Sequence, residues 1–520
     1  MCIRDRNRDT RSEALDAARD IWAALGAPDI SDDEAQTILS AVGYVADDSL
    51  LANIRTLTRG SFYQRLAAES QQRVERLVPM ILVLAKNNET PGIVVSRMLA
   101  LVRAVAGRSG YLQALSDQPE ALEHLIKLFS QSSWLAGFVA RQPIVIDELL
   151  TQAEIHTDAG AVFAETNAFA ERLRDTPLDV QMDRFRQFRQ AREMRIACKQ
   201  LDGSLTLMEV SDQLSWLAES IIAGVITLVL NPLEERYGQP TFRHNDETVS
   251  SHAGVIAYGK LGGQELGFGS DLDLVFVHDS KGSAQTTNGK KSIDNAMFYA
   301  RLTQKFVHFM STNTPAGILY EIDLRLRPNG SSGVLVSGLD AYAEYQQSDA
   351  WVWEHQALMR ARMVYGNKAL QARFDAIRKQ VLAKPRPKSE LRNAVAEMRE
   401  RMRQAFGTTS PGQMHLKQDA GGIADIEFIV QYLVLAHAQK HDELLAYTDN
   451  VRVLGAVQDL RLLPAAECQT LRTAYLSLRE RLHRRALEEV GAVVPLDNEL
   501  ATIIESVTAL RMRILGEETL

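Results

Sequence analysis

Apolar residues recur with a helical period over most of the chain, and only a central part has the period of strands. Before about residue 230, apolar positions repeat every three to four residues, with breaks at Gly26-Ala-Pro28 and Asn87-Asn88. An apolar run at 272–277 predicts a buried strand, and strict alternation over 318–328 predicts a second one. The pattern therefore predicts an α+β fold in which a small sheet is embedded in extensive helical regions.

The segments around these strands have their own signals. We interpret 238–252 as a polar lead-in to the sheet and 281–291 as a polar loop with an Asn288-Gly289 turn. Residues 292–310 predict a helix behind the sheet. The Lys384-Pro-Arg-Pro-Lys388 run is a linker, because no helix tolerates it. Further helices are predicted over 391–406 and from about 425, where apolar residues again follow helical spacing.

Composition is typical of a soluble intracellular protein with several domains. The chain has 520 residues and a net charge of −8, which argues against a nucleic-acid partner. The longest apolar stretch, 221–230, is closed by Asn231-Pro232 and is too short to span a membrane. Residues 1–20 are too charged for a secretory signal. The three cysteines form no metal or disulfide framework, which favours a reducing cytoplasm; they are Cys2, Cys198 and Cys468.

The most informative stretch joins a glycine-rich turn to two aspartates. Side chains alternate along a strand, so Asp271 and Asp273 point one way and Leu272, Leu274 and Phe276 point the other. Two close carboxylates repel unless a cation lies between them, and oxygen ligands suit Mg²⁺. Glycines let a backbone approach a phosphate closely and offer it bare N–H groups; here they are Gly259, Gly262, Gly263, Gly267 and Gly269. A solvated surface pair of acids is the alternative, but burying both beside an apolar run is costly without a cation.

A third acid follows on the second predicted strand. Asp323 would share one strand face with Arg325 and Arg327. The acid can join a metal shell or accept a proton, and the arginines can neutralise a polyphosphate. A salt-bridged edge strand is the alternative for this segment taken alone. Together, the two strands predict metal-dependent chemistry on a nucleoside triphosphate.

These motifs make the chain recognisable. Gly259-Lys260, followed after ten residues by Asp271-x-Asp273 and later by Asp323, resembles the DNA polymerase β-like nucleotidyltransferase superfamily, which implies a core with a small mixed sheet. Lys260 is a departure, because many members carry a phosphate-binding serine there; Ser270 is a candidate for the missing hydroxyl. Four longer segments resemble glutamine synthetase adenylyltransferase more specifically: they are 258–276, 323–333, 350–362 and 421–432.

The resemblance implies a reaction and a set of partners. It implies transfer of AMP from ATP to a tyrosine hydroxyl of glutamine synthetase, which regulates nitrogen assimilation in the cytoplasm. Asp271, Asp273 and Asp323 would be catalytic and would bind Mg²⁺. A PII-type signal protein and glutamine are implied regulators. Nucleotide binding would fall to a larger set of residues, namely Gly259, Lys260, Gly262, Gly263, Ser270, Arg325 and Arg327.

The family usually carries two catalytic halves on one chain, one that removes AMP and one that adds it. Only one such group of acids is present here, and Trp351-Val-Trp-Glu-His-Gln356 with the long helical tail resembles the C-terminal, adenylylating half. We therefore expect a fragment of a longer protein or an incomplete gene model. The predicted domains are a helical region at 1–110, a nucleotidyltransferase domain at 111–383 with its catalytic core at about 250–365, and a helical domain at 389–520.

Several residues have two open interpretations. Asp425 and Glu427 begin a predicted helix, where acids complement the helix dipole, but the glycine turn beside Lys417 could instead close over bound nucleotide. Glu354 lies in the tryptophan-rich segment, whose aromatic residues either stack on adenine or pack structurally. A row of arginines is either a solvated face or part of the nucleotide cleft; it comprises Arg184, Arg186, Arg189, Arg192 and Arg195.

Three rival functions remain open. The first is the phosphorolytic, de-adenylylating half of the same enzyme, against which the tryptophan-rich segment argues. The second is a uridylyl- or aminoglycoside-type nucleotidyltransferase, which we would not expect to carry 421–432 in this form. The third is a catalytically silent module that binds nucleotide or glutamine. Three intact acids argue against that third function.

Overall fold

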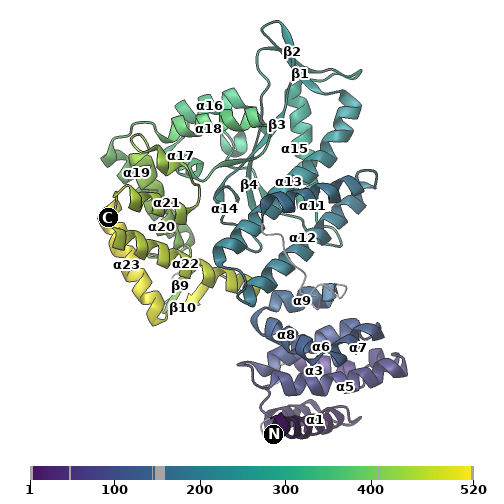
Figure 1. The fold of residues 1–520 in the computed structure, drawn as a ribbon. Coiled ribbons are helices and arrows are strands. Elements are labelled where there is room, and N and C mark those ends of the chain that lie inside the picture. Colours follow the sequence, from purple (N-terminus) through teal and green to yellow (C-terminus); the bar gives the residue numbers. More distant parts are fainter. Residues whose placement is uncertain (1–3, 46–47, 143–144, 147–157, 408–409, 517–520) are drawn as a thin grey trace. The chain divides into compact units, whose positions relative to one another are not determined.

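The computed structural model describes residues 4–45, 48–142, 145–146, 158–407 and 410–516, and most of these residues are helical (Figure 1). Contacts between residues divide the chain into two units. Unit 1 comprises residues 1–155, 197–204 and 484–490, and unit 2 comprises 156–196, 205–483 and 491–520. The ends of α12 (Leu178–Leu201) and α22 (Ala465–Leu487) therefore belong to unit 1.

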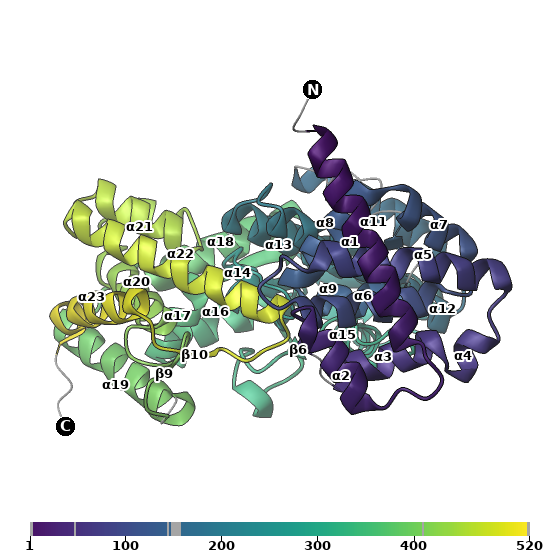
Figure 2. The same cartoon turned by 90° about the horizontal axis from the view of Figure 1, so that it is seen from below.

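Unit 1 is built from helices, as the apolar period predicts (Figure 2). Its long helices pack through buried aliphatic residues such as Leu77, Leu99 and Leu125, and the predicted breaks near residues 26–28 and 87–88 fall between helices. Ser132 donates to the carbonyl of Leu487 over 2.8 Å, which attaches the end of α22 to this unit. The helices are α1 (Arg4–Leu25), α2 (Asp32–Ala41), α3 (Asp48–Thr58), α4 (Ser61–Gln64), α5 (Ala68–Ala85), α6 (Pro91–Val105), α7 (Ser109–Asp117), α8 (Pro119–Gln131) and α9 (Ser133–Arg141).

The main sheet of unit 2 has the order β6–β4–β3–β8, with β7 also paired to β4. Strand β3 is antiparallel to β4 and β8, whereas β6 and β7 run parallel to β4, so the sheet is mixed as predicted. The strands are β3 (Ala253–Ala257), β4 (Leu272–His278), β6 (Ile322–Asp323), β7 (Val336–Gly338) and β8 (Arg362–Tyr365).

Two smaller sheets and a set of helices complete unit 2. One small sheet joins β1 (Pro240–His244), β2 (Glu247–Ser250) and β5 (Ser283–Thr287), and the other joins β9 (Gln413–His415) and β10 (Val493–Pro495). Short 3₁₀ turns lie at Gly330–Ser332 and Asp442–Leu445. The helices are α11 (Ala159–Leu173), most of α12, α13 (Leu207–Tyr237), α14 (Gly259–Gly262), α15 (Asn295–Ser311), α16 (Leu339–Ser348), α17 (Val352–Met359), α18 (Lys368–Leu382), α19 (Lys388–Phe406), α20 (Ile423–His437), α21 (Asn450–Asp459), most of α22, and α23 (Asn498–Leu515).

The main sheet separates two hydrophobic cores. Leu272, Leu274 and Phe276 face a core shared with α13 and α15, and Phe276 packs edge-to-face on Phe306 with ring centroids 5.2 Å apart. The alternate residues Val275 and Val277 face a second core shared with α18, α19, α20 and α22. The strand alternation predicted for β4 is confirmed. Because the C-terminal helices cover one face of the sheet, they are part of the structure that positions the site.

The apolar helix α13 is longer than the sequence predicts. We expected Asn231-Pro232 to end the apolar stretch, but the helix continues through Pro232 to Tyr237. Among the described residues, this one helix has the length and hydropathy to cross a membrane, yet 78% of its most apolar window is buried within the structure. Tertiary packing around α13 outweighs the local helix-breaking effect of proline.

Two local predictions are wrong, and a third segment holds more structure than expected. The polar segment at 238–252 leads into β3 as predicted, but it also contains the β1–β2 hairpin. The predicted loop at 281–291 contains β5, which pairs with β1. Polar residues on both faces hide such strands from a hydrophobic-period analysis. The predicted strand at 318–328 shrinks to Ile322–Asp323, because the chain turns from Arg325 onward.

The fold class is otherwise confirmed as mainly helical with small sheets. The predicted helix behind the sheet is α15, the linker at 384–388 falls mostly between α18 and α19, and the later helices are α19 and α20. The division into two units near residue 155 does not test the predicted domain boundaries at 110 and 383, which stay predictions.

Candidate active site

The glycine turn connects β3 to β4 and contacts the central aspartate. The chain leaves β3 at Ala257, makes the short helix α14, and re-enters the sheet at Leu272. Gly259 has a φ of +55°, and a Cβ there would lie 2.0 Å from Oδ2 of Asp273. Only glycine fits this position, because both the backbone conformation and the space exclude a side chain. The turn and the aspartate are therefore in direct contact.

Asp273 and Asp323 are neighbours across two parallel strands. The register of β4 and β6 pairs Leu272 with Ile322 and Asp273 with Asp323. Asp271 lies just before β4 and is exposed. Burial, together with the charges of Asp271 and Asp323, raises the pKa of Asp273 to about 6. The structure thus brings the three predicted acids close enough to repel one another.

Asp323 is held by Arg325 in a tight local turn. The backbone N–H and Nε of Arg325 each donate to the Asp323 carboxylate over 2.7 Å. These hydrogen bonds from Arg325 lower the pKa of Asp323. Arg325 is itself 79% exposed, so its guanidinium lies at the surface. Arg327 instead donates to the carbonyls of Leu324 and Ser331, over 2.8 and 3.1 Å, which orders the loop. The prediction that both arginines share a strand face with Asp323 is therefore wrong.

Lys260 and Ser270 meet at the two ends of the turn. Nζ of Lys260 donates to Oγ of Ser270 over 3.2 Å, and the backbone N–H of Gly267 donates to the same oxygen over 3.3 Å. Burial, followed by the positive charge of Lys417, lowers the pKa of Lys260, and Asp271 and Glu427 oppose that shift. The predicted lysine and hydroxyl are brought together.

Gly262 and Gly263 use their N–H groups within the turn. Their amides donate to the carbonyls of Tyr258 and Gly259, over 2.8 and 3.1 Å. A Cβ on Gly262 would lie 2.0 Å from the carbonyl oxygen of Arg360, and one on Gly263 would lie 2.5 Å from its Nη2. The packing of Arg360 against the turn is thus what requires glycine here. A phosphate contact through these two amides stays a prediction, and the structure gives both residues a different role.

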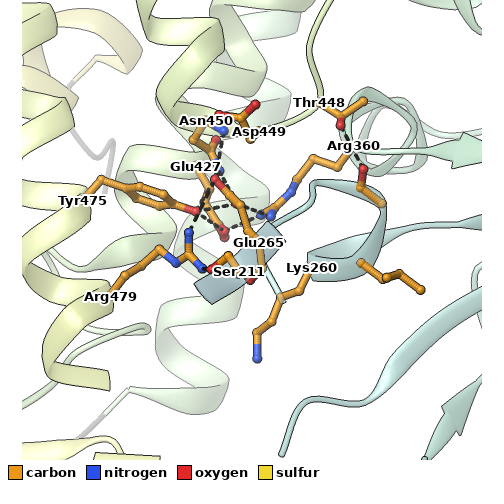
Figure 3. Close-up of polar contacts among 12 residues, drawn as sticks. Ser211, Lys260, Glu265, Arg360, Glu427, Thr448, Asp449, Asn450, Tyr475 and Arg479 are labelled. Carbon is orange, nitrogen blue, oxygen red and sulfur yellow. Dashed lines mark hydrogen bonds and ion pairs between the residues drawn. The ribbon is translucent and has the colours of Figure 1, made fainter. Parts of the chain in front are cut away.

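A buried carboxylate–arginine–carboxylate triad lies behind the turn (Figure 3). It consists of Glu265, Arg360 and Glu427, and Arg360 is ion-paired with both acids. Glu265 also accepts from the hydroxyl of Tyr475 over 2.7 Å and from the backbone N–H of Asn450 over 3.0 Å. Burial tends to raise the pKa of Glu427, but the charges of Arg360 and Lys417 outweigh it and the pKa is lowered. The triad joins the glycine turn to α20, α21 and α22.

Further polar contacts extend this triad. Arg479 donates to the carbonyl oxygen of Glu265 over 3.0 Å and to Oγ of Ser211 over 2.7 Å. Thr448 donates to the carbonyl of Gly262 over 2.8 Å. Figure 3 shows the side chain of Lys260 pointing away from these contacts. The turn is therefore anchored on the side opposite its lysine.

The other predicted supporting residues are placed differently. Asp425 is buried, accepts from Nε of Arg399 over 2.6 Å and accepts from the backbone N–H of Gly421 over 2.7 Å, which matches the helix-start interpretation. Glu354 accepts from the hydroxyl of Tyr345 over 2.8 Å and from the N–H of Trp351 over 2.9 Å. These contacts shape the start of α17, and Trp351 is 70% exposed.

Arg186 and Arg189 of α12 fit neither interpretation offered from the sequence, whereas Arg184 is exposed, as a solvated face predicts. Arg186 is fully buried and donates to the backbone carbonyls of Gly317, Met182 and Phe309. Arg189 lies 3.8 Å from the ring centroid of Tyr320 and is paired with Glu193 over 2.8 Å. These side chains hold the segment before β6 in place.

The acids fit a divalent cation by chemistry. Asp273 is a half-buried carboxylate whose pKa is raised first by burial and then by the charges of Asp271 and Asp323, and oxygen ligands suit Mg²⁺. Within the described residues, however, no group of three or more His, Cys, Asp or Glu side chains is arranged closely enough to hold a metal ion. The three acids are thus close enough to repel one another, but in the described residues they do not form a complete set of metal ligands.

Sequence reasoning missed Glu265 and Arg360. Both fall inside the segments that carry the family resemblance, yet neither has a periodic or charge signal that marks it as buried. Their pairing spans 95 residues of sequence. The single available signal was an acid within a glycine-rich turn, which is equally typical of an exposed loop.

Comparison with known proteins shows which protein families the chain resembles. Residues 122–377 match the family model of glutamate-ammonia ligase adenylyltransferase, and residues 389–489 match that of GlnD PII-uridylyltransferase. The chain is thus related to nucleotidyltransferases over both segments. The second match includes 421–432, but the expectation that a uridylyltransferase would not carry this segment in the same form stays a prediction.

Curated relatives identify a more specific family. The chain is 42% identical over 499 residues to the bifunctional glutamine synthetase adenylyltransferase/adenylyl-removing enzyme of Thioalkalivibrio sulfidiphilus, covering 96% of this chain and 51% of that protein. It is 40% identical over 487 residues to the protein of the same name from Pseudomonas aeruginosa, covering 91% and 49%. The chain belongs to the glutamine synthetase adenylyltransferase family. It spans about half the length of the curated relatives it matches.

Proposed function

We propose that this chain transfers AMP from ATP to a tyrosine hydroxyl of glutamine synthetase, as the adenylylating half of its family does. The observation that carries the proposal is the pairing of Asp273 with Asp323 beside Gly259, in a chain whose relatives bear that enzyme name. The uncompensated charge of the acids supports an Mg²⁺ requirement, with Asp271, Asp273 and Asp323 as the residues that would hold the ion. When bound, the ion would offset negative charge on the phosphates.

The chain's own residues would orient the reactants. Lys260 and Ser270 would contact the triphosphate from the turn, and Gly259 leaves space beside Asp273. Arg325, which is exposed next to Asp323, would contact the pyrophosphate. The tyrosine oxygen attacks the α-phosphorus, the bond between that phosphorus and the bridging oxygen to the β-phosphate breaks, and pyrophosphate leaves. Asp323 would accept the hydroxyl proton.

The alternative is the adenylyl-removing reaction, which the relatives' names also contain. In that reaction orthophosphate attacks the phosphorus of the modified tyrosine, and ADP is released. The single group of acids in the sequence and the 351–356 segment support the adenylylating half by resemblance. We further propose that a PII-type protein and glutamine regulate the reaction in the cytoplasm.

The test uses ATP labelled at the α-phosphate, Mg²⁺ and unmodified glutamine synthetase. We expect label on the synthetase, none when EDTA replaces Mg²⁺, and none with Asp273→Asn. A parallel reaction contains adenylylated synthetase, orthophosphate and Mg²⁺. Rapid ADP release there, without transfer in the forward reaction, would assign the chain to the removing half. No nucleotide chemistry in either direction would support the silent module.

A further inference from the structure

Lys417 lies at the start of the C-terminal helices, and the reaction proposed above leaves it without a role. It is half-buried between β9 and α20, and the carbonyl oxygen of Lys417 accepts the backbone N–H of Ala424 over 3.0 Å. In the part of the chain that the structure describes, its ammonium group has no ion-pair partner. The charge of Lys417 does act on Glu427, but that carboxylate is already paired with Arg360, so the lysine can also bind an anion.

The buried triad fixes this lysine relative to the glycine turn. Glu265 belongs to the turn, since its N–H donates to the carbonyl of Lys260 over 2.8 Å. Arg360 connects Glu265 to Glu427, which lies in the first two turns of α20. The beginning of the same helix donates to the backbone of Lys417. An unbroken series of polar contacts therefore runs from Lys260 to Lys417.

The charges of the two lysines act on the same groups. The positive charge of Lys417 lowers the pKa of Lys260, and both lysines oppose the rise in the pKa of Asp273. Two ammonium groups that influence each other in this way repel. Glu427, a carboxylate on which both lysines act, already shares its charge with Arg360, so a further anion between the lysines would relieve the repulsion. Asp273, another acid that both lysines influence, is the central candidate for a magnesium ligand. A metal-bound polyphosphate has the charge pattern that complements both the lysines and the acid.

We propose that Lys417 is a second triphosphate-binding residue, held beside Lys260 by the Glu265–Arg360–Glu427 triad. This inference rests on the proposed function and assigns the polyphosphate site to two parts of the chain, the glycine turn and the C-terminal helices. Glu265, Arg360 and Glu427 are positioning residues, because they act through the two lysines. The helices that follow the linker are thereby part of the nucleotide site.

The first test measures binding to Lys417→Gln by calorimetry, without glutamine synthetase, so that no turnover occurs. We expect Mg-ATP and magnesium pyrophosphate to bind about ten-fold more weakly, as for the loss of one charged hydrogen bond. The affinity of Lys417→Gln for adenosine should equal that of the wild type, and Lys417→Arg should bind ATP as tightly as the wild type does. Lys281→Gln is the matched control, since Lys281 is also half-buried in unit 2 and also lacks an ion pair among the described residues.

A double-mutant cycle then tests the triad. Glu427→Gln keeps the shape of the side chain but removes its charge. We expect the Lys417→Gln effect on ATP affinity to shrink to less than about three-fold in that background, because the lysine is no longer positioned. A merely structural role of Glu427 would lower stability and leave the Lys417 effect unchanged.

The outcomes separate this inference from the proposed function. If the wild type binds Mg-ATP and Lys417→Gln binds it equally well, the role of Lys417 is wrong while the proposed function stands. If Lys417→Gln weakens the binding of adenosine as much as the binding of pyrophosphate, the lysine does not act on the phosphates, and the inference is also wrong. If the wild type binds no nucleotide, both are wrong.

Discussion

Asp273, the central acid of the three aspartates, contacts the glycine turn that also carries Glu265 of the Glu265–Arg360–Glu427 triad, but the charges of the two clusters are balanced in opposite ways. Beside the start of the turn, burial and the charges of two other acids raise the pKa of Asp273 to about 6. In the middle of the turn, Glu265 shares a buried arginine with Glu427 of α20, and the pKa of Glu427 is lowered. The first cluster has negative charge left for a cation, whereas the second has its charge satisfied within the protein.

This difference teaches which acids are available for chemistry. A buried carboxylate that already has a guanidinium and several donors gains little from a metal ion, and losing its partner is costly. A carboxylate that repels its neighbours is stabilised by any cation that arrives. Substitution of an aspartate in the first cluster should therefore reduce activity more than stability. Substitution of a residue in the triad should reduce stability more than activity.

The largest expected effect is on activity, from Asp273→Asn. AMP transfer should fall by on the order of a thousand-fold, because a candidate metal ligand is lost. The melting temperature without divalent cations should hold or rise, since repulsion with Asp271 and Asp323 is removed. The check is the labelled-ATP assay together with a thermal melt in EDTA. Full activity in this variant would refute the proposed role of the aspartates.

The next effect is on stability, from Glu265→Ala. Arg360 would be left with one acid, and the hydroxyl of Tyr475 would lose its acceptor at 2.7 Å, leaving Oε1 of Glu427 at 3.5 Å. We expect the free energy of unfolding of unit 2 to fall by about 3 kcal/mol, as for a broken buried ion pair. Asp340→Ala, which removes an exposed partner of Arg373, is the control and should cost below about 1 kcal/mol. If denaturant unfolding gives the same loss of free energy of unfolding for Glu265→Ala and Asp340→Ala, the proposed difference between buried and exposed ion pairs is wrong.

A smaller effect is expected from Arg325→Ala. The variant removes an exposed guanidinium and leaves the buried packing intact, so stability should not change measurably. Activity should fall by about ten-fold, as one charged contact to the substrate is lost. Because Arg325 lowers the pKa of Asp323, the acid limb of the pH–rate profile should move to higher pH. An unmoved acid limb would show that Asp323 does not titrate in the reaction.

The smallest effect concerns the pH dependence of stability. The folded pKa of Asp273 is raised from 3.8 to about 6, so the folded state binds more protons than the unfolded state between those values. Stability from this group therefore decreases as the pH rises through that window. Between pH 4 and pH 7 without metal, the wild type should lose on the order of 1 kcal/mol relative to Asp273→Asn. Parallel unfolding curves of the two proteins at both pH values test this difference.

The sequence predicted more of the sheet's centre than of its edges. The alternation of β4 and the glycine turn before it were recognisable because apolar periodicity and glycine placement are local signals. Strands β1, β2 and β5 were missed, since their residues are mostly polar and partly exposed. Strand β6 was predicted too long, because Arg325 folds back onto Asp323 and no periodicity reveals that turn.

The sequence by itself determined the α+β class, the glycine turn, the aspartates of the candidate site and the family resemblance. Each depends on residues close to one another in the chain or on motifs that stand in the chain as written. Tertiary structure alone decided which glycines approach Asp273 and which pack on Arg360, and which acids are satisfied. Electrostatic balance depends on distances between side chains far apart in sequence, such as Glu265 and Tyr475, and no local pattern encodes those distances.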